Sequence, residues 1–176
     1  MNMLRRPAVL ADILLLAMDV DGVLTDGTVI IHHDGTESKR FSLLDGHGIK
    51  LWRSAGLEMA WISGRASDAT RRRAEQLGVA LVFENAAAKL PVLEQLLKTT
   101  RLDAAQVAYI GDDLIDLPIL RSVGLAVAVP DAVDEVRAAA DYVTTRRGGS
   151  GAVRETIEHI LKGSGRWNAL MERHIP

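Results

Sequence analysis

Six short runs of apolar and β-branched residues recur along the chain, and segments with a helical pattern separate them. The runs occupy residues 13–18, 57–62, 79–83, 107–110, 125–129 and 141–145. Continuous apolar runs of this length are typical of strands buried on both faces. The other segments predict helices at 48–56, 67–78, 86–100, 114–124, 132–140 and 151–163. This alternation predicts an α/β fold, with a parallel central sheet and helices on both of its faces.

Residues with strong preferences at helix ends support these boundaries. Ser67 begins its helical segment as an N-cap, and three glycines stand where glycine commonly closes a helix, at Gly56, Gly78 and Gly124. The sequence therefore indicates where these helices begin and end.

One segment departs from the alternation. Residues 28–43 form two extended arms around Asp34 and Gly35, which predicts a β-hairpin. A tail of residues 164–176 follows the last helix. With 176 residues, the chain is long enough for one ordinary domain with a sizeable core, so we expect a single domain over residues 1–176.

Composition removes several classes of function. The formal net charge of −2 gives no reason to expect nucleic acid or an anionic membrane as a partner. The absence of cysteine excludes disulfides, thiolate catalysis and zinc–thiolate sites. No apolar stretch approaches the roughly 20 residues needed to span a bilayer. The apolar run near the N-terminus is broken by Asp12 and reads as a leader before the first strand, so we expect a cytoplasmic protein.

Polar residues gather where the predicted strands end. In open α/β sheets, ligands bind beyond the carboxyl ends of the strands. The residues that follow the first four runs are Asp19 and Asp21, then Ser63, Gly64 and Arg65, then Lys89, then Gly111, Asp112 and Asp113. Carboxylates, a hydroxyl group, glycines and cations are thus expected to share one edge of the sheet.

The carboxylates in this group indicate a metal. Asp19 and Asp21 are two residues apart on an extended chain, so their side chains point the same way, and we expect Asp112 to join them. Three acids around one point require a hard divalent cation, and Mg²⁺ with oxygen ligands fits best. Lys89 and Ser63 would then offer donors to a phosphate.

Four segments carry a resemblance to a known family. DVDGVLTDG at 19–27, ISGR at 62–65, Lys89 and GDDLIDLP at 111–118 resemble, in order and spacing, the four motifs of the haloacid dehalogenase (HAD) phosphohydrolases. The resemblance implies a three-layer, Rossmann-like fold and a covalent mechanism. It implies that Asp19 is the nucleophile that forms an aspartyl-phosphate, and that Asp21 is the general acid and base.

The same resemblance assigns the remaining site residues. It implies that Mg²⁺ is held by the carboxylates of Asp19 and Asp112 and by the backbone carbonyl of Asp21. Ser63 and Lys89 would bind the transferring phosphoryl group. Asp113 would hold the waters of the metal from outside its ligand shell. Asp116 is placed equally well beside Asp113 or as an acid that favours the first turn of its own helix.

A narrower resemblance follows from the spacing, which leaves no room for a cap domain. The segments LDGHGIKLW at 44–52, ADYVT at 140–144 and GGSGAVRE at 148–155 are similar to those of the capless phosphatases of 3-deoxy-D-manno-octulosonate 8-phosphate (KDO 8-phosphate). That family implies a homotetramer whose neighbouring subunits shield each other's sites, and a role in lipopolysaccharide precursor synthesis. Family members often carry arginine where this chain has Leu44 and Ser150, which predicts looser discrimination of the sugar acid.

Contacts to the sugar acid are expected from two places. Arg65 follows the second strand and is the best placed arginine for a carboxylate. The glycine-rich segment from Gly148 to Gly151 opens a helix, and its backbone N–H groups, Gly149 among them, would face an anion. The alternative for this segment is a flexible linker.

Other features have simpler explanations. Arg71, Arg72 and Arg73 point in three directions around a helix and are expected to form a solvated face. His32 and His33 face opposite sides of a strand, which favours hairpin surface or subunit contact over a metal. The hairpin's apolar residues predict an edge that pairs with another subunit. The tail, with Trp167, Leu170 and Met171, either frays or docks on a neighbour.

Two classes of function remain after these observations. The first is a Mg²⁺-dependent phosphatase of KDO 8-phosphate or of another nonulosonate phosphate. The second is an accessory subunit that keeps the fold for assembly, as in proteins associated with phenylphosphate carboxylation. The complete set of site residues favours the enzyme, because a scaffold gains nothing from clustered charge.

Overall fold

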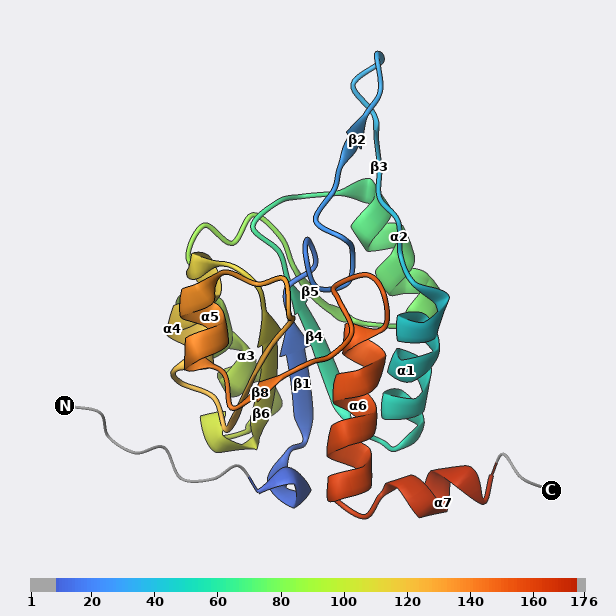
Figure 1. Cartoon of the computed structure of the whole chain (residues 1–176), viewed down its shortest axis with the longest axis vertical. Coiled ribbons are helices and arrows are strands. Elements are labelled where there is room, and N and C mark those ends of the chain that lie inside the picture. The colour runs from blue at the N-terminus through green and yellow to red at the C-terminus, as the bar shows by residue number, and fades with distance from the viewer. Residues whose placement is uncertain (1–8, 174–176) are drawn as a thin grey trace.

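The computed structural model describes residues 9–173 and is built around a six-stranded sheet (Figure 1). The strand order is β5-β4-β1-β6-β7-β8, and every neighbouring pair is parallel. The strands are β1 (Leu15–Met18), β4 (Glu58–Ile62), β5 (Leu81–Phe83), β6 (Val107–Gly111), β7 (Leu125–Ala128) and β8 (Tyr142–Val143). Each of the six apolar runs contains one strand, which confirms the predicted parallel sheet.

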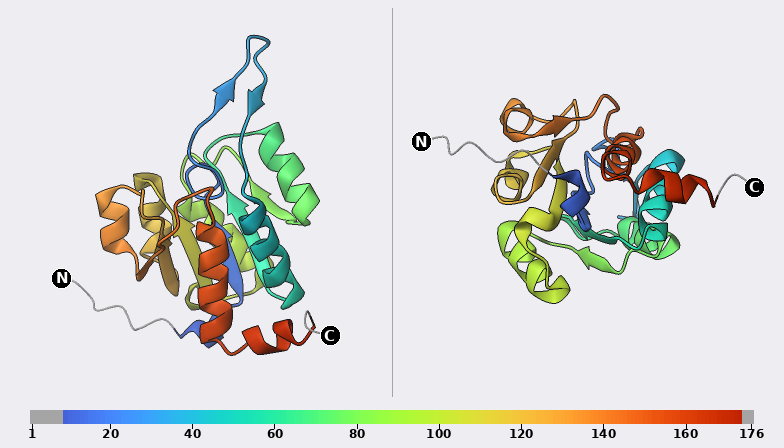
Figure 2. Two further views of the ribbon diagram at one scale, coloured as in Figure 1. Left: turned by 45° about the vertical axis from the view of Figure 1, so that its right-hand side comes forward. Right: turned by 90° about the horizontal axis from the view of Figure 1, so that it is seen from below.

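Helices cover both faces of this sheet. One face carries α1 (Leu43–Ser54), α2 (Asp68–Leu77) and α6 (Ala152–Gly163), and the other carries α3 (Leu90–Thr100), α4 (Leu117–Leu120) and α5 (Asp134–Ala139) (Figures 1 and 2). Short 3₁₀ turns lie at Leu10–Asp12, Ala104–Gln106 and Leu114–Asp116. This division follows from right-handed crossovers, because the chain moves from β1 to β4 and β5 and then returns to β6.

Strand β1 occupies the centre of the sheet. Leu15 lies opposite Glu58 on β4 and Val107 on β6, and Met18 lies opposite Trp61 and Ile110. All four residues of β1 are fully buried, which explains their uninterrupted apolarity. The buried apolar side chains of the described residues join into one contiguous core.

Helix α1 begins five residues earlier than the sequence suggested. The Ser42 hydroxyl oxygen accepts hydrogen bonds from the N–H groups of Leu44 and Asp45 at 3.1 and 3.3 Å, so it caps a helix that starts at Leu43. Gly48, which suggested a helix start, lies inside α1. A Cβ there would come within 3.0 Å of Arg154 Cα, so glycine lets α1 approach α6 closely.

Most of the other helix ends agree with the expected ones. Ser67 caps α2 by accepting from the Thr70 N–H at 3.3 Å, and Gly78 closes that helix in the left-handed conformation. Gly124 is different, because it does not adopt a left-handed conformation. A Cβ at this position would lie 2.0 Å from the carbonyl oxygen of Ala105, so glycine serves a close approach of two loops.

The predicted hairpin is confirmed, although its paired part is short. Strands β2 (Ile30–Ile31) and β3 (Glu37–Ser38) are antiparallel and protrude beyond the sheet (Figures 1 and 2). Ile30 and Ile31 are 49% and 74% exposed. Phe41, an apolar residue of the other arm of the predicted hairpin, does not add to this edge, because it packs against the core with the Arg73 guanidinium above its ring. No separate cap is evident between β1 and α1 or between β4 and β5 in the described chain.

The C-terminal tail packs on its own chain. Helix α7 (Trp167–Met171) buries Leu170, and Trp167 and Met171 pack against the same core. This part of the tail does not fray, and its docking on a neighbour stays a prediction. The expected leader begins in residues 1–8, and the tail ends in residues 174–176, both outside the described residues. Within 9–173, every helix is too short or too polar to cross a membrane.

Candidate active site

The site forms where the strand order reverses. The chain leaves β1 toward β4 on one side and later returns to β6 on the other, so the carboxyl end of β1 opens into a crevice between diverging loops. Asp19 follows β1 directly, and its N–H donates to the Ile110 carbonyl at 3.0 Å, which extends the ladder with β6. Its side chain is 10% exposed, and Oδ1 accepts from the Val20 N–H at 2.7 Å.

Gly22 allows the loop after Asp19 to turn tightly beside β6. Its φ of +93° lies in the left-handed region, and a Cβ there would meet Asp112 Oδ2 at 2.0 Å. Thr25 completes the turn, because its hydroxyl oxygen accepts from the N–H groups of Gly22 and Gly27 at 3.3 and 3.2 Å. This glycine therefore brings the first and last acidic segments together.

Three carboxylates gather at this point, but they are not the three that the sequence suggested. Asp19, Asp112 and Asp116 offer oxygens that all lie within 4.8 Å of one another. The carboxylate of Asp21 instead contacts the ammonium of Lys39. Alternation along an extended chain does not apply here, because the chain turns at the end of β1 instead of continuing as a strand.

Asp116 has its oxygens satisfied by the protein. Oδ1 accepts from Lys89 Nζ at 2.7 Å and from the Tyr109 hydroxyl at 2.6 Å, and Oδ2 accepts from the N–H groups of Asp112 and Asp113 at 3.0 and 3.3 Å. Asp116 thus contacts both Lys89 and the backbone of its own turn. Asp19 and Asp112 remain as the carboxylates available to a cation.

The electrostatics of these two acids fit a divalent cation. Burial raises the pKa of Asp112, and the neighbouring Asp19 and Asp116 charges raise it further. Burial also raises the pKa of Asp19, against the opposing effect of Lys89. Asp112 Oδ1 is buried without a hydrogen-bond partner among the described residues. A hard cation would satisfy that oxygen and offset the repulsion between the carboxylates, so the residues present suit Mg²⁺.

Lys89 forms an ion pair with Asp19, the candidate nucleophile. Its side chain is 1% exposed, and its Nζ lies 2.9 Å from Asp19 Oδ1 and 2.7 Å from Asp116 Oδ1. Burial acts to lower the pKa of Lys89, but the two carboxylates outweigh it and raise that pKa, so the side chain is a fixed cation. It immediately precedes α3, as its position after the third strand suggested.

The other expected site residues occupy different settings. Ser63 is buried, and its hydroxyl oxygen accepts from the Arg65 N–H at 3.1 Å, which leaves its proton available to a ligand. Gly64 is exposed beside open space. The Arg65 guanidinium pairs with Glu37 of the hairpin at 2.8 Å. Asp113 is exposed and accepts from the N–H of Leu114, so it caps its own turn.

The glycine-rich loop corrects one expectation. The N–H of Gly149 donates to the Val23 carbonyl at 2.9 Å, and that of Gly151 donates to Asp45 Oδ2 at 3.1 Å. The N–H groups of Gly148 and Ser150 also have partners within the chain. The expectation of free N–H groups for a ligand anion is wrong for this conformation, and so is the flexible-linker alternative. The anion at the start of α6 is the chain's own Asp45.

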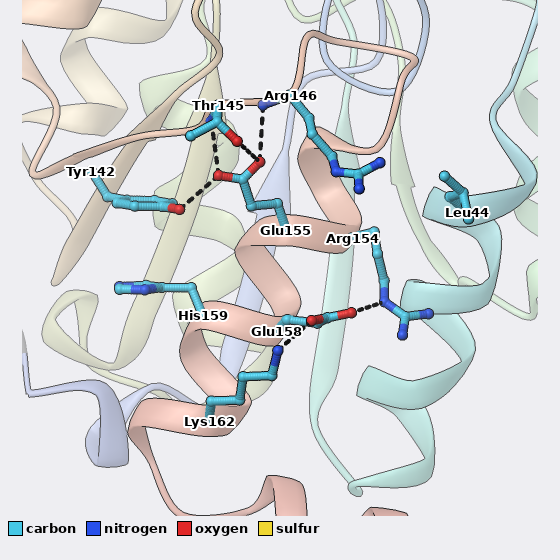
Figure 3. A pocket seen from close by; sticks show the side chains of 9 residues that line it. All are labelled: Leu44, Tyr142, Thr145, Arg146, Arg154, Glu155, Glu158, His159 and Lys162. Carbon is cyan, nitrogen blue, oxygen red and sulfur yellow. Dashed lines mark hydrogen bonds and ion pairs between the residues drawn. The ribbon is translucent and has the colours of Figure 1, made fainter.

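A groove lies on α6, away from the acidic cluster. It measures about 480 Å³ and runs between α6 and the N-terminal end of α1 (Figure 3). Figure 3 shows the Arg146 side chain pointing into it, and Tyr142 and Glu155 joined by a hydrogen bond. Leu44, one of the two departures from the family pattern, also lines this groove. None of the expected catalytic residues does.

Comparison with known proteins agrees with the fold and the site. A family model of haloacid dehalogenase-like hydrolases matches residues 75–155. This places the chain in a class of hydrolases, the HAD phosphohydrolases among them, whose motifs the sequence resembled.

Individual relatives indicate one family within these hydrolases. The KDO 8-phosphate phosphatase of Yersinia pestis is 43% identical over 151 residues, which cover 86% of this chain and 81% of that protein. The crystal structure of the Moraxella catarrhalis KDO 8-phosphate phosphatase, in complex with magnesium, phosphate and KDO, superposes with a TM-score of 0.91 at 41% identity, covering 94% of this chain and 95% of that one.

The cobalt-bound deoxy-D-mannose-octulosonate 8-phosphate phosphatase from Haemophilus influenzae gives a TM-score of 0.86 at 41% identity, with 89% of this chain and 91% of that one covered. The chain belongs to the family of KDO 8-phosphate phosphatases within the HAD-like hydrolases.

Proposed function

We propose that the chain is a Mg²⁺-dependent phosphatase that hydrolyses KDO 8-phosphate to KDO and inorganic phosphate, as a step in making lipopolysaccharide precursors. The observation that carries this proposal is the contact of a buried lysine with the acid after β1, beside a second acid with an oxygen that has no hydrogen-bond partner in residues 9–173. A carboxylate in this setting can attack phosphorus, while the lysine neutralises the phosphoryl oxygens.

The proposed reaction has two halves. Asp19 attacks phosphorus, the bond from phosphorus to the ester oxygen breaks, and Asp21 gives its carboxyl proton to the departing sugar oxygen. Water then attacks the aspartyl-phosphate, Asp21 takes a proton from that water, and the bond from phosphorus to Asp19 breaks. The two halves return both carboxyl groups to their starting state.

Other residues bind and orient the phosphoryl group in this proposal. Lys89 and the Ser63 hydroxyl donate to its oxygens, with the exposed Gly64 beside them. The carboxylates of Asp19 and Asp112 and the backbone carbonyl of Asp21 would hold Mg²⁺, which supplies positive charge between the nucleophile and the phosphate. Asp113 would bind the waters of the metal, and Asp116 holds Lys89 in place.

Recognition of the sugar acid is the less constrained part of the proposal. Arg65 is half-exposed and would bind the carboxylate of the substrate with the N–H donors that Glu37 does not use. Leu44 and Ser150 replace arginines common in the family, and this favours a second candidate, the phosphate of another nonulosonate. We further propose a cytoplasmic homotetramer, supported by the exposed Ile30 and Ile31 of the hairpin.

A phosphate-release assay on a panel of phosphorylated sugar acids tests this function. We expect turnover of KDO 8-phosphate that disappears with EDTA and returns with Mg²⁺. Turnover of a different nonulosonate phosphate alone would move the protein to the second candidate. No turnover of any phosphate ester, with or without Mg²⁺, would favour the accessory subunit.

A further inference from the structure

A lysine of the hairpin is buried against the acid–base candidate. Lys39 directly follows β3, and its side chain is 0% exposed although the hairpin protrudes from the molecule. Its Nζ donates to Asp21 Oδ2 at 2.9 Å and lies 2.7 Å from Oδ1. The same ammonium donates to the hydroxyl oxygen of Thr70 at 3.4 Å. Burying an ammonium is unfavourable unless it is paired, so Asp21 fixes where this side chain lies.

The return arm of the hairpin is anchored at a second point. Glu37 precedes Lys39 by two residues, so both side chains leave the extended arm on the same side. Glu37 pairs with Arg65 at 2.8 Å, and the nearby Ser67 lowers the pKa of Glu37. Arg65 and Ser67 belong to the loop between β4 and α2. The arm that delivers Lys39 is thus held to the rim of the site.

Asp21 has few other constraints. Among residues 9–173, Lys39 is the one side chain with a hydrogen bond or ion pair to its carboxylate. The Asp21 side chain is 23% exposed, but Oδ1 is buried. The oxygen that can meet a substrate or water is therefore Oδ2, which has a further lone pair beyond the one that accepts from Lys39.

We propose that Lys39 is a positioning residue for proton transfer by Asp21. The inference rests on the proposed function, because it assigns Lys39 to the same reaction. Lys39 itself exchanges no proton. It fixes the carboxyl plane so that Oδ2 faces the ester oxygen in the first half of the reaction and the attacking water in the second, which is where orientation contributes most to the rate.

A double-mutant cycle tests this role. Lys39→Met removes the ammonium and keeps most of the length of the side chain, and Asp21→Asn removes the proton carrier. We expect Lys39→Met to lower kcat by about 10²-fold, near the lower limit for losing general acid–base catalysis, with little change in KM. In the Asp21→Asn background, Lys39→Met should have almost no further effect. Lys98→Met, an exposed lysine of α3, is the matched control and should keep full activity.

Rapid kinetics with p-nitrophenyl phosphate supply a readout that a folding defect would not move. Its leaving group needs little protonation, so attack by Asp19 should stay fast in Lys39→Met, while hydrolysis of the aspartyl-phosphate slows. We expect a burst of nitrophenolate followed by slow turnover. Lys39→Arg, which keeps a cation, should recover part of the rate and lose the burst.

The outcomes distinguish failure of the proposed function from failure of the proposed role of Lys39. If the wild-type protein hydrolyses no phosphate ester, the proposed function fails, and the role of Lys39 fails with it. If the wild-type protein is active but the losses from Lys39→Met and Asp21→Asn multiply in the double variant, only the Lys39 inference is overturned. A rise in KM at unchanged kcat would likewise overturn it, and would make Lys39 a substrate contact.

Discussion

The ammonium of Lys89 lies between two carboxylates, 2.9 Å from Asp19 and 2.7 Å from Asp116, with almost no exposure to solvent. The acid after β1 therefore has one oxygen paired with a cation of the protein, and its side chain keeps 10% exposure. A carboxylate placed in this way is oriented for attack and is not trapped in a closed ion pair.

Asp19→Asn should abolish hydrolysis of every phosphate ester while the protein stays folded. The amide keeps the shape of the side chain, and it removes one negative charge from a crowded site, so stability should not fall. Steady-state phosphate release together with thermal unfolding measures both effects. Near-normal turnover by Asp19→Asn would exclude the covalent mechanism.

Asp112 should make the metal-free protein less stable as pH rises. Burial and the Asp19 charge raise the pKa of Asp112 from its ordinary 3.8 to about 8. Because this pKa is higher in the folded state, Asp112 contributes its full share to the free energy of unfolding below about pH 4. That contribution is lost as pH rises toward 8. In EDTA, the free energy of unfolding should fall between pH 5 and pH 8.

Chemical denaturation across that pH range is the measurement. Asp112→Asn should flatten the profile in EDTA, and saturating Mg²⁺ should do the same for the wild-type protein, because the cation stabilises the charged carboxylate. The difference between wild type and variant isolates the contribution of Asp112. If the free energy of unfolding fell equally with pH for both proteins in EDTA, ionisation of Asp112 would not be what destabilises the folded state.

Gly148→Ala should weaken both the fold and the site. A Cβ at residue 148 would lie 1.7 Å from the carbonyl oxygen of Gly22, within the loop that carries Asp21. Backbone atoms cannot give way easily, so we expect a loss of about 1–3 kcal/mol in stability. A lower kcat should accompany it as the loop shifts. Ser150→Ala, at an exposed position of the same turn, is the control and should change neither.

Much of this fold could be predicted because the residue patterns that indicate its strands and helices are local in the sequence. Each apolar run became a strand, and the order of polar residues after those strands located the crevice. The start of α1 was missed although Ser42 and Asp45 stand three residues apart, which is a capping signal. The glycines at 46 and 48 obscured it. These two glycines allow close packing of α1 against its neighbours, and that packing cannot be predicted from adjacent residues in the sequence.

The contact between Lys39 and Asp21 could not be predicted from such signals. It depends on how far the hairpin folds back, and a lysine in an extended arm ordinarily points into water. The loop at 148–151 was misinterpreted for a related reason. Its glycines suggested a cradle for an anion, yet they allow contact with the backbone around Gly22, and that contact exists only in three dimensions.

The hairpin should join subunits. Ile31 is 74% exposed on a strand whose other edge has no partner within the described chain. We expect light scattering to give about four times the 19.1 kDa of one chain, and Ile31→Glu to lower that mass. Thr36→Glu, at the exposed tip of the same hairpin, controls for added charge. A wild-type monomer at micromolar concentration would contradict the proposed assembly.

Arg65→Ala should separate recognition of the sugar acid from chemistry. Glu37 occupies part of the Arg65 guanidinium, but the group has five N–H donors and is 50% exposed, so it can also bind the carboxylate of a substrate. We expect the KM for KDO 8-phosphate to rise more than that for p-nitrophenyl phosphate, which has no carboxylate. Glu37→Gln, which releases Arg65 from its ion pair, should leave the KM for KDO 8-phosphate unchanged or lower it. An equal loss on both substrates in Arg65→Ala would assign Arg65 to the phosphate or to anchoring the hairpin.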